Sequence, residues 1–536
     1  MKIGKIAARG LVGLDRIQAV TLAALCTVGL LGCEARDPDW DAQTSSSAEA
    51  VGLSGSVFLR DTALDRFLFL SSASGQELTI DTFPAGKNLS VVQASSDRSQ
   101  LFVLSRGEFP RLKEDDEGPR LMVFDGGRKP QLSKTFNLDD PMTKLAVDPK
   151  GEWVAAYAGD ATVTNQNELV LFELKGEGDT PVARAIRSFG GAPVELLFTD
   201  ELLVPQGGAR RFLVVRTDRD ITIVDLKHLD RSEVTIKLPE RADKTAYVPA
   251  QVVYDDGAPD VDDDAQIAIR LLETSDLVML NLGASDEPDK DFKVNNNIVD
   301  VGGVPSSIEF VRTDGGLRLA ALVPAALRAT LVNPDTIQSE SVELPFGFNQ
   351  MTRITAGLED TPEAGDVALL WGAGAQIAFW SLGETASTPF RSVDTNALSF
   401  AVSRVIDVPA PHAHLKVLEG AGGSGFFVLD LKKRQSFPLS TKSAGYTIQP
   451  SPDGLRLWIT RSGTREFSTV SLNDLHPSEL YVEPGVGRLF DIEQEDGGRA
   501  VVIVHDQGGL SATLMDALDP NSANTKYFPA LQLEGF

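Results

Sequence analysis

Short apolar strands that end in a polar residue recur along this chain of 536 residues at nearly constant steps. Two of them are LMVFD at residues 121–125 and FFVLD at residues 426–430, and the steps between successive ends are 43 to 56 residues. A regular spacing of this length is typical of repeat proteins, in which each repeat is one supersecondary unit. The ten segments end at residues 81, 125, 173, 225, 281, 333, 381, 430, 473 and 516, and nine of them end in Asp, Asn or Glu.

A second apolar strand precedes most of these segments, and a tight turn precedes several of the second strands. FLFL at residues 67–70 precedes LTID at residues 78–81, and LRLWIT at residues 455–460 follows the turn SPDG at residues 451–454. Proline presets the negative φ of such a turn and glycine supplies the positive one. Each unit therefore reads as four short strands joined by turns, in which the polar-ended segment is the third strand and an outer strand follows it.

Four strands in a unit of this length predict a propeller blade. The strands are apolar at nearly every position, which fits blades stacked face to face with both faces buried. An array of β-sandwich modules would repeat at about 90 to 100 residues, and no long stretch has the apolar period of a helix. We predict an all-β fold, a β-propeller of about eight to ten four-stranded blades over residues 51–536, and favour one large ring over two smaller ones.

The units resemble the YVTN and WD40-like propeller repeats of bacterial envelope proteins. SPDGLRLWIT at residues 451–460 resembles them most, and the resemblance covers roughly residues 52–533. The Gly-His and Trp-Asp marks of WD40 blades are missing. So is the repeating Trp pattern of quinoprotein-type blades, which removes the case for a pyrroloquinoline quinone site.

The first 32 residues have the features of a signal peptide. A basic start is followed by an apolar run at residues 19–31, which is short for a membrane span of about 20 residues. The run ends in LLGC at residues 30–33, which resembles the lipobox of bacterial lipoproteins. The resemblance implies cleavage before Cys33 and lipidation of its sulfur. An uncleaved anchor and a soluble secretory signal are the alternatives.

A lipid on Cys33 determines the expected organisation of the mature chain. Cys26 leaves with the signal peptide, so no free thiol remains for a disulfide or for catalysis. Residues 33–50 become the lipidated cysteine and a flexible polar tether. In the lipoprotein family an Asp after the cysteine often marks inner-membrane retention, and Glu34 stands there instead. We therefore expect a membrane-anchored lipoprotein of the cell envelope, at the periplasmic face or the surface of the outer membrane.

The net charge and the absence of catalytic motifs exclude several classes of function. The formal net charge of −26 argues against a nucleic-acid binder, whose phosphate contacts need surplus cations. The chain has no G-x-S-x-G, H-E-x-x-H or P-loop motif. The leading hypothesis is a non-enzymatic binding or scaffold protein for a protein or glycan partner. A lactonase-like hydrolase with a site in the central channel and a structural spacer are the alternatives, because propellers host many functions.

Few residues qualify as metal ligands, and we predict no cofactor. The acidic run at residues 255–264 offers Asp260, Asp262 and Asp264 to Ca²⁺. An EF-hand needs Gly at the sixth loop position and Glu at the twelfth; Ala265 and Leu271 stand there, so we expect weak or no calcium binding. His412 and His414 supply two ligands, whereas catalytic zinc needs three. The acidic run at residues 114–117 and the tryptophans at positions 153, 371, 380 and 458 are interpreted as loop and blade core, respectively.

The two ends of the array are expected to meet. An open ring would leave unpaired faces and strand edges, which promote aggregation. We predict that residues 56–59 and part of residues 526–533 lie in the same or adjacent blades.

Overall fold

The computed structural model describes residues 49–529 and Leu531, with gaps at 63–64, 75–76, 160–164, 176–180, 206–207, 256–264, 286–291, 314, 355–365, 383–392, 421–424, 440–446 and 506–510, and at 521–524. The predicted signal peptide, Cys33 and residues 34–48 lie outside the described residues. So do Asp260, Asp262 and Asp264.

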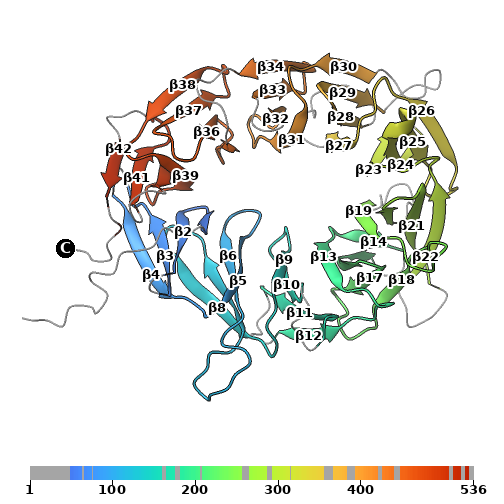
Figure 1. The fold of residues 1–536 in the computed structure, drawn as a ribbon, viewed down its shortest axis with the longest axis horizontal. Helices are drawn as coiled ribbons and strands as arrows, with labels where there is room; N and C mark the ends of the chain where they lie inside the picture. The colour runs from blue at the N-terminus through green and yellow to red at the C-terminus, as the bar shows by residue number, and fades with distance from the viewer. Residues whose placement is uncertain are drawn as a thin grey trace, which may run out of the picture.

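The described residues form ten four-stranded antiparallel sheets, arranged as blades around a single ring (Figure 1). In each blade the first strand lies toward the centre of the ring and the fourth strand lies outside (Figure 1). Blade 4 carries an additional hairpin, β14 (Leu202–Val204) with β15 (Gly208–Arg210), between its first and second strands. The all-β propeller prediction is confirmed, at the upper end of the expected blade number.

The strands of blades 1 to 5 follow the chain in order. Blades 1 and 2 contain β1 (Ala50–Gly52), β2 (Ser56–Asp61), β3 (Arg66–Ser71) and β4 (Thr79–Pro84), then β5 (Leu89–Ala94), β6 (Gln100–Ser105), β7 (Arg120–Asp125) and β8 (Gln131–Asn137). Blades 3 to 5 contain β9 (Lys144–Val147), β10 (Trp153–Tyr157), β11 (Glu168–Glu173) and β12 (Val182–Ala185), then β13 (Pro193–Phe198), β16 (Phe212–Thr217), β17 (Asp220–Asp225) and β18 (Val234–Lys237), then β19 (Pro249–Asp255), β20 (Gln266–Leu271), β21 (Asp276–Gly283) and β22 (Lys293–Asp300).

Blades 6 to 10 continue in the same way. Blades 6 and 7 contain β23 (Ser307–Thr313), β24 (Gly316–Val323), β25 (Arg328–Val332) and β26 (Ser339–Glu343), then β27 (Gln350–Ile354), β28 (Val367–Ala373), β29 (Gln376–Ser381) and β30 (Val393–Ala397). Blades 8 to 10 contain β31 (Val402–Asp407), β32 (Leu415–Gly420), β33 (Phe426–Asp430) and β34 (Gln435–Leu439), then β35 (Thr447–Pro450), β36 (Arg456–Thr460), β37 (Glu466–Ser471) and β38 (Pro477–Tyr481), then β39 (Val486–Glu493), β40 (Arg499–His505), β41 (Ser511–Asp516) and β42 (Thr525–Phe528).

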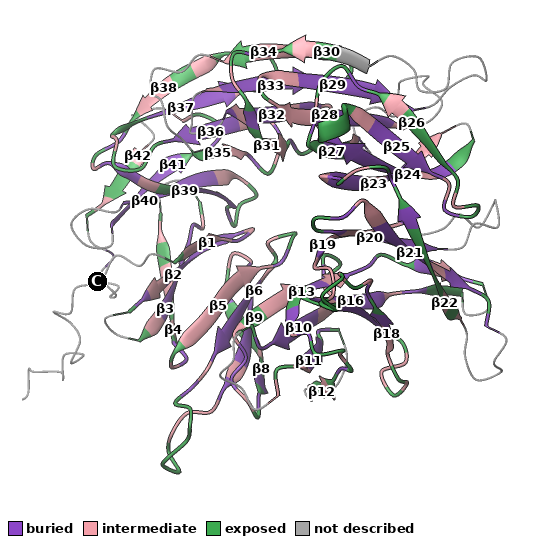
Figure 2. Ribbon diagram, turned by 45° about the vertical axis from the view of Figure 1, so that its right-hand side comes forward, coloured by how far each residue is buried: buried purple, intermediate pink, exposed green. Residues whose placement is uncertain are grey.

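The core lies between adjacent blades, and consecutive residues of one strand belong to different parts of it. In β7, Leu121 and Val123 pack against blade 3, whereas Met122 packs with blade 1. Side chains of a strand alternate between the two faces of its sheet, so a strand buried on both faces has to be apolar throughout. Figure 2 shows the middle strands of the blades buried, with exposed residues concentrated on the fourth strands.

The assignment of the first repeat is wrong by one strand. FLFL at residues 67–70 belongs to β3, the third strand of blade 1, and LTID at residues 78–81 enters β4, the outer strand. The other nine polar-ended segments are third strands as predicted. The error arose because LTID has an apolar start and a terminal Asp, although β4 has no buried residue and lies at the edge of its blade.

The ring closes by packing of blade 1 against blade 10, and among the described residues β1 pairs within blade 1 and β42 pairs within blade 10. Val57 and Leu59 of β2 share one apolar cluster with Phe528 of β42 and with Leu531, which is 2% exposed. The prediction that the two ends of the array lie in adjacent blades is therefore confirmed.

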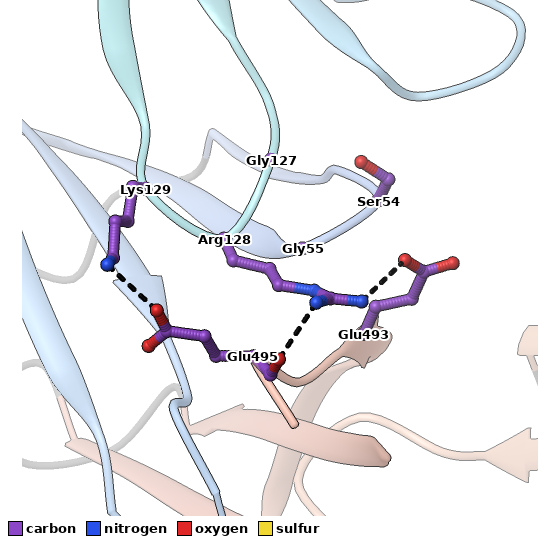
Figure 3. A pocket seen from close by; sticks show the side chains of 7 residues that line it. All are labelled: Ser54, Gly55, Gly127, Arg128, Lys129, Glu493 and Glu495. Atoms are coloured by element: carbon purple, nitrogen blue, oxygen red, sulfur yellow. Dashed lines mark hydrogen bonds and ion pairs between the residues drawn. The ribbon is translucent and has the colours of Figure 1, made fainter. Parts of the chain in front are cut away.

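Polar contacts join the same seam, and some of them come from blade 2. Arg98 donates hydrogen bonds to the carbonyl oxygens of Gly52 (3.0 Å), Leu53 (2.9 Å) and Asp491 (3.2 Å). On the surface, Arg128 and Lys129 of the turn after β7 reach the end of β39 and the turn that follows it (Figure 3). The cross-seam distances are 3.6 Å from Arg128 to Glu493 and 2.8 Å from Lys129 to Glu495. Three blades therefore take part in the closure.

The antiparallel order divides the loops between two faces of the ring. Connections from the first to the second strand and from the third to the fourth strand emerge on one face, which we call the turn face. Connections from the second to the third strand and between blades emerge on the opposite face. The chain enters β1 from this opposite face, because β1 is the first strand of its blade.

Candidate functional site

A charged pocket opens on the turn face between blades 3 and 4. Its volume is about 630 Å³, which lies within the range of about 300 to 1,000 Å³ found for ligand pockets. Blade 3 supplies Trp153 at the start of β10 and Glu173 at the end of β11. Blade 4 supplies residues at the base of the β14–β15 hairpin and in the turn after β17. Its lining residues are Glu201, Ala209, Arg210, Arg211, Leu226, Lys227, Leu229 and Asp230.

Two arginines of the pocket wall are held by carboxylates beneath it. Arg210 donates to Asp225 Oδ2 at 2.8 Å, and Arg211 binds both carboxylate oxygens of Asp148. Arg211 also reaches Glu152 Oε2 at 2.8 Å. Because these pairs are largely shielded from solvent and hydrogen-bonded, the guanidinium groups are fixed parts of the wall.

The pKa values of Asp148 and Arg211 reflect this pairing. Burial opposes the ionisation of Asp148, but the Arg211 guanidinium and the N–H groups of Lys150 and Glu152 outweigh it and hold the pKa of Asp148 below its ordinary value. The hydrogen bond from Arg211 to Asp148 raises the pKa of Arg211. Both groups therefore stay charged at neutral pH.

The apolar part of the pocket is the indole of Trp153 together with Leu229. Both side chains pack against the core cluster between blades 3 and 4, and both line the pocket. Trp153 is only half-buried. The interpretation of Trp153 as blade core was thus incomplete, whereas Trp380 and Trp458, at 0% and 1% exposed, are core residues as predicted.

The carboxylates at the mouth of the pocket are of a different kind. Glu173, Glu201 and Asp230 are exposed, and so is Lys227. Within the described part of the chain none of these four side chains forms an ion pair. The mouth therefore carries charge that the fold itself does not use.

The two histidines singled out by spacing do lie together. The ring centroids of His412 and His414 are 5.8 Å apart, but both residues belong to a turn after β31 and not to a strand. His412 Nε2 lies 3.0 Å from Asn473 Oδ1, and burial lowers the pKa of His414. Among the described residues no group of three or more His, Cys, Asp or Glu side chains is arranged to hold a metal ion.

The second acidic run lies in the loop between β6 and β7, as predicted. Asp116 accepts hydrogen bonds from the N–H groups of Leu112 (2.7 Å) and Lys113 (2.8 Å), so it shapes its own loop. The side chains of Asp260, Asp262 and Asp264 lie outside the described residues, and calcium binding by them stays a prediction.

One carboxyl group on an inner strand has unusual chemistry. Glu309 lies on β23, and burial raises its pKa to about 7, against a smaller opposing effect of Arg353. Arg353 Nε pairs with Asp366 Oδ2 at 2.8 Å. Two carboxylates therefore lie around one arginine at the contact of blades 6 and 7.

Local motifs did not identify the pocket between blades 3 and 4. Its residues come from two repeats, and the chain brings them together only when the blades stack. One indirect signal is present: the step from residue 173 to residue 225 is among the longer ones, and it contains the β14–β15 hairpin that forms part of the wall.

Comparisons with known proteins add little to the fold. No family model matches the chain, and no curated protein matches it in sequence. Solved structures similar to it include the Dos1 propeller, with 13% identity, 71% of this chain and 93% of that chain covered, and a TM-score of 0.35. BBS1N in complex with ARL6DN has 13% identity and a TM-score of 0.33, with 63% of this chain and 89% of that chain covered. Apo AztD from Citrobacter koseri has 13% identity and a TM-score of 0.31, with 73% of this chain and 96% of that chain covered.

At these scores the similarities support no argument about function. The class of the protein follows from its own strand order, which is that of a ten-bladed β-propeller. In the described part of the chain no helix is long and apolar enough to span a membrane.

Proposed function

We propose that this protein is a binding propeller of the cell envelope, anchored by a lipid on Cys33, which presents the turn face of its ring to a protein or glycan partner. The observation that carries the proposal is the pocket between blades 3 and 4. Its walls are strands and short turns fixed by buried ion pairs, and its mouth carries unpaired charge. A rigid scaffold with loops and pockets at one end is a common arrangement for recognition sites.

The direction of the chain supports this orientation. The chain enters the ring at Ala50, the first residue of β1, from the face opposite the pocket. An anchor at Cys33 would therefore leave the turn face directed away from the membrane, where a partner can reach it.

Two experiments test the proposal. Cys33→Ser should move the protein from the membrane to the soluble fraction or leave it as an uncleaved precursor; a mature-sized variant that stays in the membrane pellet after high-salt washing would exclude the lipid anchor. Capture of partners from solubilised envelopes should then be compared for the wild type and for the triple variant Glu173→Gln, Glu201→Gln, Asp230→Asn.

A matched control has the same change of charge elsewhere. Glu114, Glu340 and Glu343 are exposed and lie outside the pocket, so their replacement by Gln should leave capture unchanged. Loss of a stoichiometric partner with the pocket variant alone supports the proposal. Equal capture by the wild type and both variants would exclude the pocket as the binding site.

The alternative of a hydrolase rests on Glu309. A carboxyl group whose pKa is near 7 can act as a general acid or base at neutral pH, and such groups occur often in active sites. The alternative predicts esterase or lactonase activity that Glu309→Gln abolishes.

For calcium, a micromolar affinity in calorimetric titration that disappears when Asp260, Asp262 and Asp264 become Asn would show a genuine site.

A further inference from the structure

We infer that the pocket between blades 3 and 4 binds the cationic side chain, Lys or Arg, of a basic polypeptide segment. The inference rests on the proposed function and names the chemistry of the partner. It depends on three observations: the charge that remains in the pocket, the position of Trp153 and the dimensions of the opening.

The pocket has an excess of negative charge. The side chains that line it, or pair with lining residues, include six carboxylates and three basic groups. Arg210 and Arg211 already face Asp225, Asp148 and Glu152, so they have little attraction left for an anionic ligand. Among the described lining residues, Lys227 is the one unpaired cation that faces Glu173, Glu201 and Asp230 at the mouth, and the nearby Lys175 pairs with Glu152.

Trp153 adds a surface that favours the same class of ligand. A cation over the face of an aromatic ring is attracted by the ring quadrupole, and tryptophan is the best of the aromatic side chains in this respect. Trp153 is held by packing on the core cluster between blades 3 and 4, so its ring needs no rearrangement on binding. Among the described residues no basic side chain covers this ring.

The size of the pocket indicates a polypeptide side chain and not a free small cation. A volume of about 630 Å³ accommodates the long alkyl stem of Lys or the planar head of Arg together with neighbouring residues of a segment. The charged head would lie over the Trp153 ring within reach of the carboxylates of the mouth, while the stem would contact Leu229. The net charge of −26 would also attract a basic partner over a longer range.

The test uses the mature protein and peptides with blocked ends. Calorimetric titration with a tri-lysine and a tri-arginine peptide should show binding that weakens at least tenfold in the triple variant Glu173→Gln, Glu201→Gln, Asp230→Asn. Trp153→Leu should also weaken it, and Trp153→Phe, which keeps an aromatic face, should weaken it less. The control triple variant at Glu114, Glu340 and Glu343 should bind as the wild type does. Melting temperatures of all variants confirm that each is folded.

Three results would overturn the inference. The first is equal affinity of the basic peptides for the pocket variant and the control variant. The second is binding of a tri-glutamate peptide at this site. The third is binding of free cadaverine as tightly as tri-lysine, which would show a site for small amines. If envelope capture depends on the pocket while basic peptides do not bind, the proposed function stands and the partner has other chemistry.

Discussion

Glu309 illustrates how burial changes the chemistry of one residue. Its carboxyl group is half-buried on β23, and among the described residues it has no hydrogen-bond partner. Loss of hydration disfavours the charged form, and the attraction of Arg353 only partly compensates. A neutral acid near pH 7 is therefore the form that the fold prefers at this position.

This preference predicts a pH-dependent stability. The pKa of Glu309 rises from 4.5 in the unfolded chain to about 7 in the folded protein, so the stabilisation that it brings is lost as pH rises from 4.5 through 7. Glu309→Gln removes this loss. The free energy of unfolding of the variant, relative to that of the wild type, should therefore increase from pH 5 to pH 8, by at most about 3 kcal/mol.

The free energy of unfolding from urea titrations at the two pH values measures this gain. The exposed Glu343→Gln serves as the control and should show the same difference from wild type at both pH values. A difference between Glu309→Gln and wild type that does not change with pH would contradict the proposed burial effect.

The turn before β36 shows how an element depends on one glycine. The turn SPDG at residues 451–454 closes with a hydrogen bond from Gly454 N–H to the Ser451 carbonyl oxygen at 2.9 Å, and φ of Gly454 is +67°. A Cβ atom at Gly454 would lie 2.3 Å from the carbonyl oxygen of Pro409. Both the backbone angle and the neighbouring blade therefore exclude a side chain here.

A matched pair of substitutions separates these two effects. Gly151 occupies the same place in the turn at residues 148–151, with φ of +64°, but a Cβ atom there would meet nothing within 4 Å. Gly151→Ala should lower the free energy of unfolding by about 1 to 2 kcal/mol, the cost of the left-handed backbone alone. Gly454→Ala should lower the free energy of unfolding clearly more, because the contact with the Pro409 carbonyl oxygen adds to the backbone cost. Equal losses in thermal or urea unfolding would mean that the contact with Pro409 is relieved without cost.

At the scale of the whole molecule, the ring depends on the seam between blades 1 and 10. The seam has an apolar part, which includes Phe528 and Leu531, and a polar part supplied from blade 2. The contacts that cross from blade 10, such as Val57 with Phe528 and Arg98 with the Asp491 carbonyl oxygen, join segments that most of the chain separates, so the seam forms only when all ten blades are in place. We expect its two parts to differ in their contribution to stability.

The C-terminal end should stabilise the entire propeller. Deletion of residues 526–536 removes most of β42 together with Phe528 and Leu531, and burial of each large apolar side chain contributes about 1.5 to 3 kcal/mol. The truncated protein should melt at a lower temperature and associate through the exposed edge of β41. Deletion of residues 532–536 alone is the control. A monomeric truncated protein with an unchanged melting temperature would refute closure by this end.

The arginines of the seam should differ in effect. Arg98→Ala removes hydrogen bonds to three carbonyl oxygens in a partly buried position, so we expect a loss of about 2 to 4 kcal/mol. Arg128→Ala removes an exposed ion pair of 3.6 Å to Glu493 and an exposed hydrogen bond of 2.9 Å to the Glu495 carbonyl oxygen, with an expected loss of about 1 kcal/mol. Urea unfolding of both variants measures the contrast. A larger loss for Arg128→Ala would show that the surface pairs, and not Arg98, secure the ring.

The fold class could be predicted from local sequence pattern, because each blade is built from one continuous stretch of the chain. Four strands and their turns lie within about 50 residues, and burial on both faces leaves a continuous apolar run, as in LVLF at residues 169–172. The turn glycines are equally readable, since a positive φ is a property of one residue. Where the local pattern was ambiguous, as at LTID, the segment was assigned to the third strand of its blade although it belongs to the fourth.

The blade number, the form of the closure and the site were decided only by the tertiary structure. The pocket gathers Trp153, Glu173, Glu201 and Asp230 from two blades, and each of these residues has ordinary neighbours in the sequence. Their role depends on which charges are already paired when the blades stack: Arg211 pairs with Asp148, whereas Glu201 has no ion pair within the part of the chain that the structure describes. Electrostatic pairing and desolvation depend on distances between residues of adjacent blades, and the spacing of residues along the chain does not determine those distances.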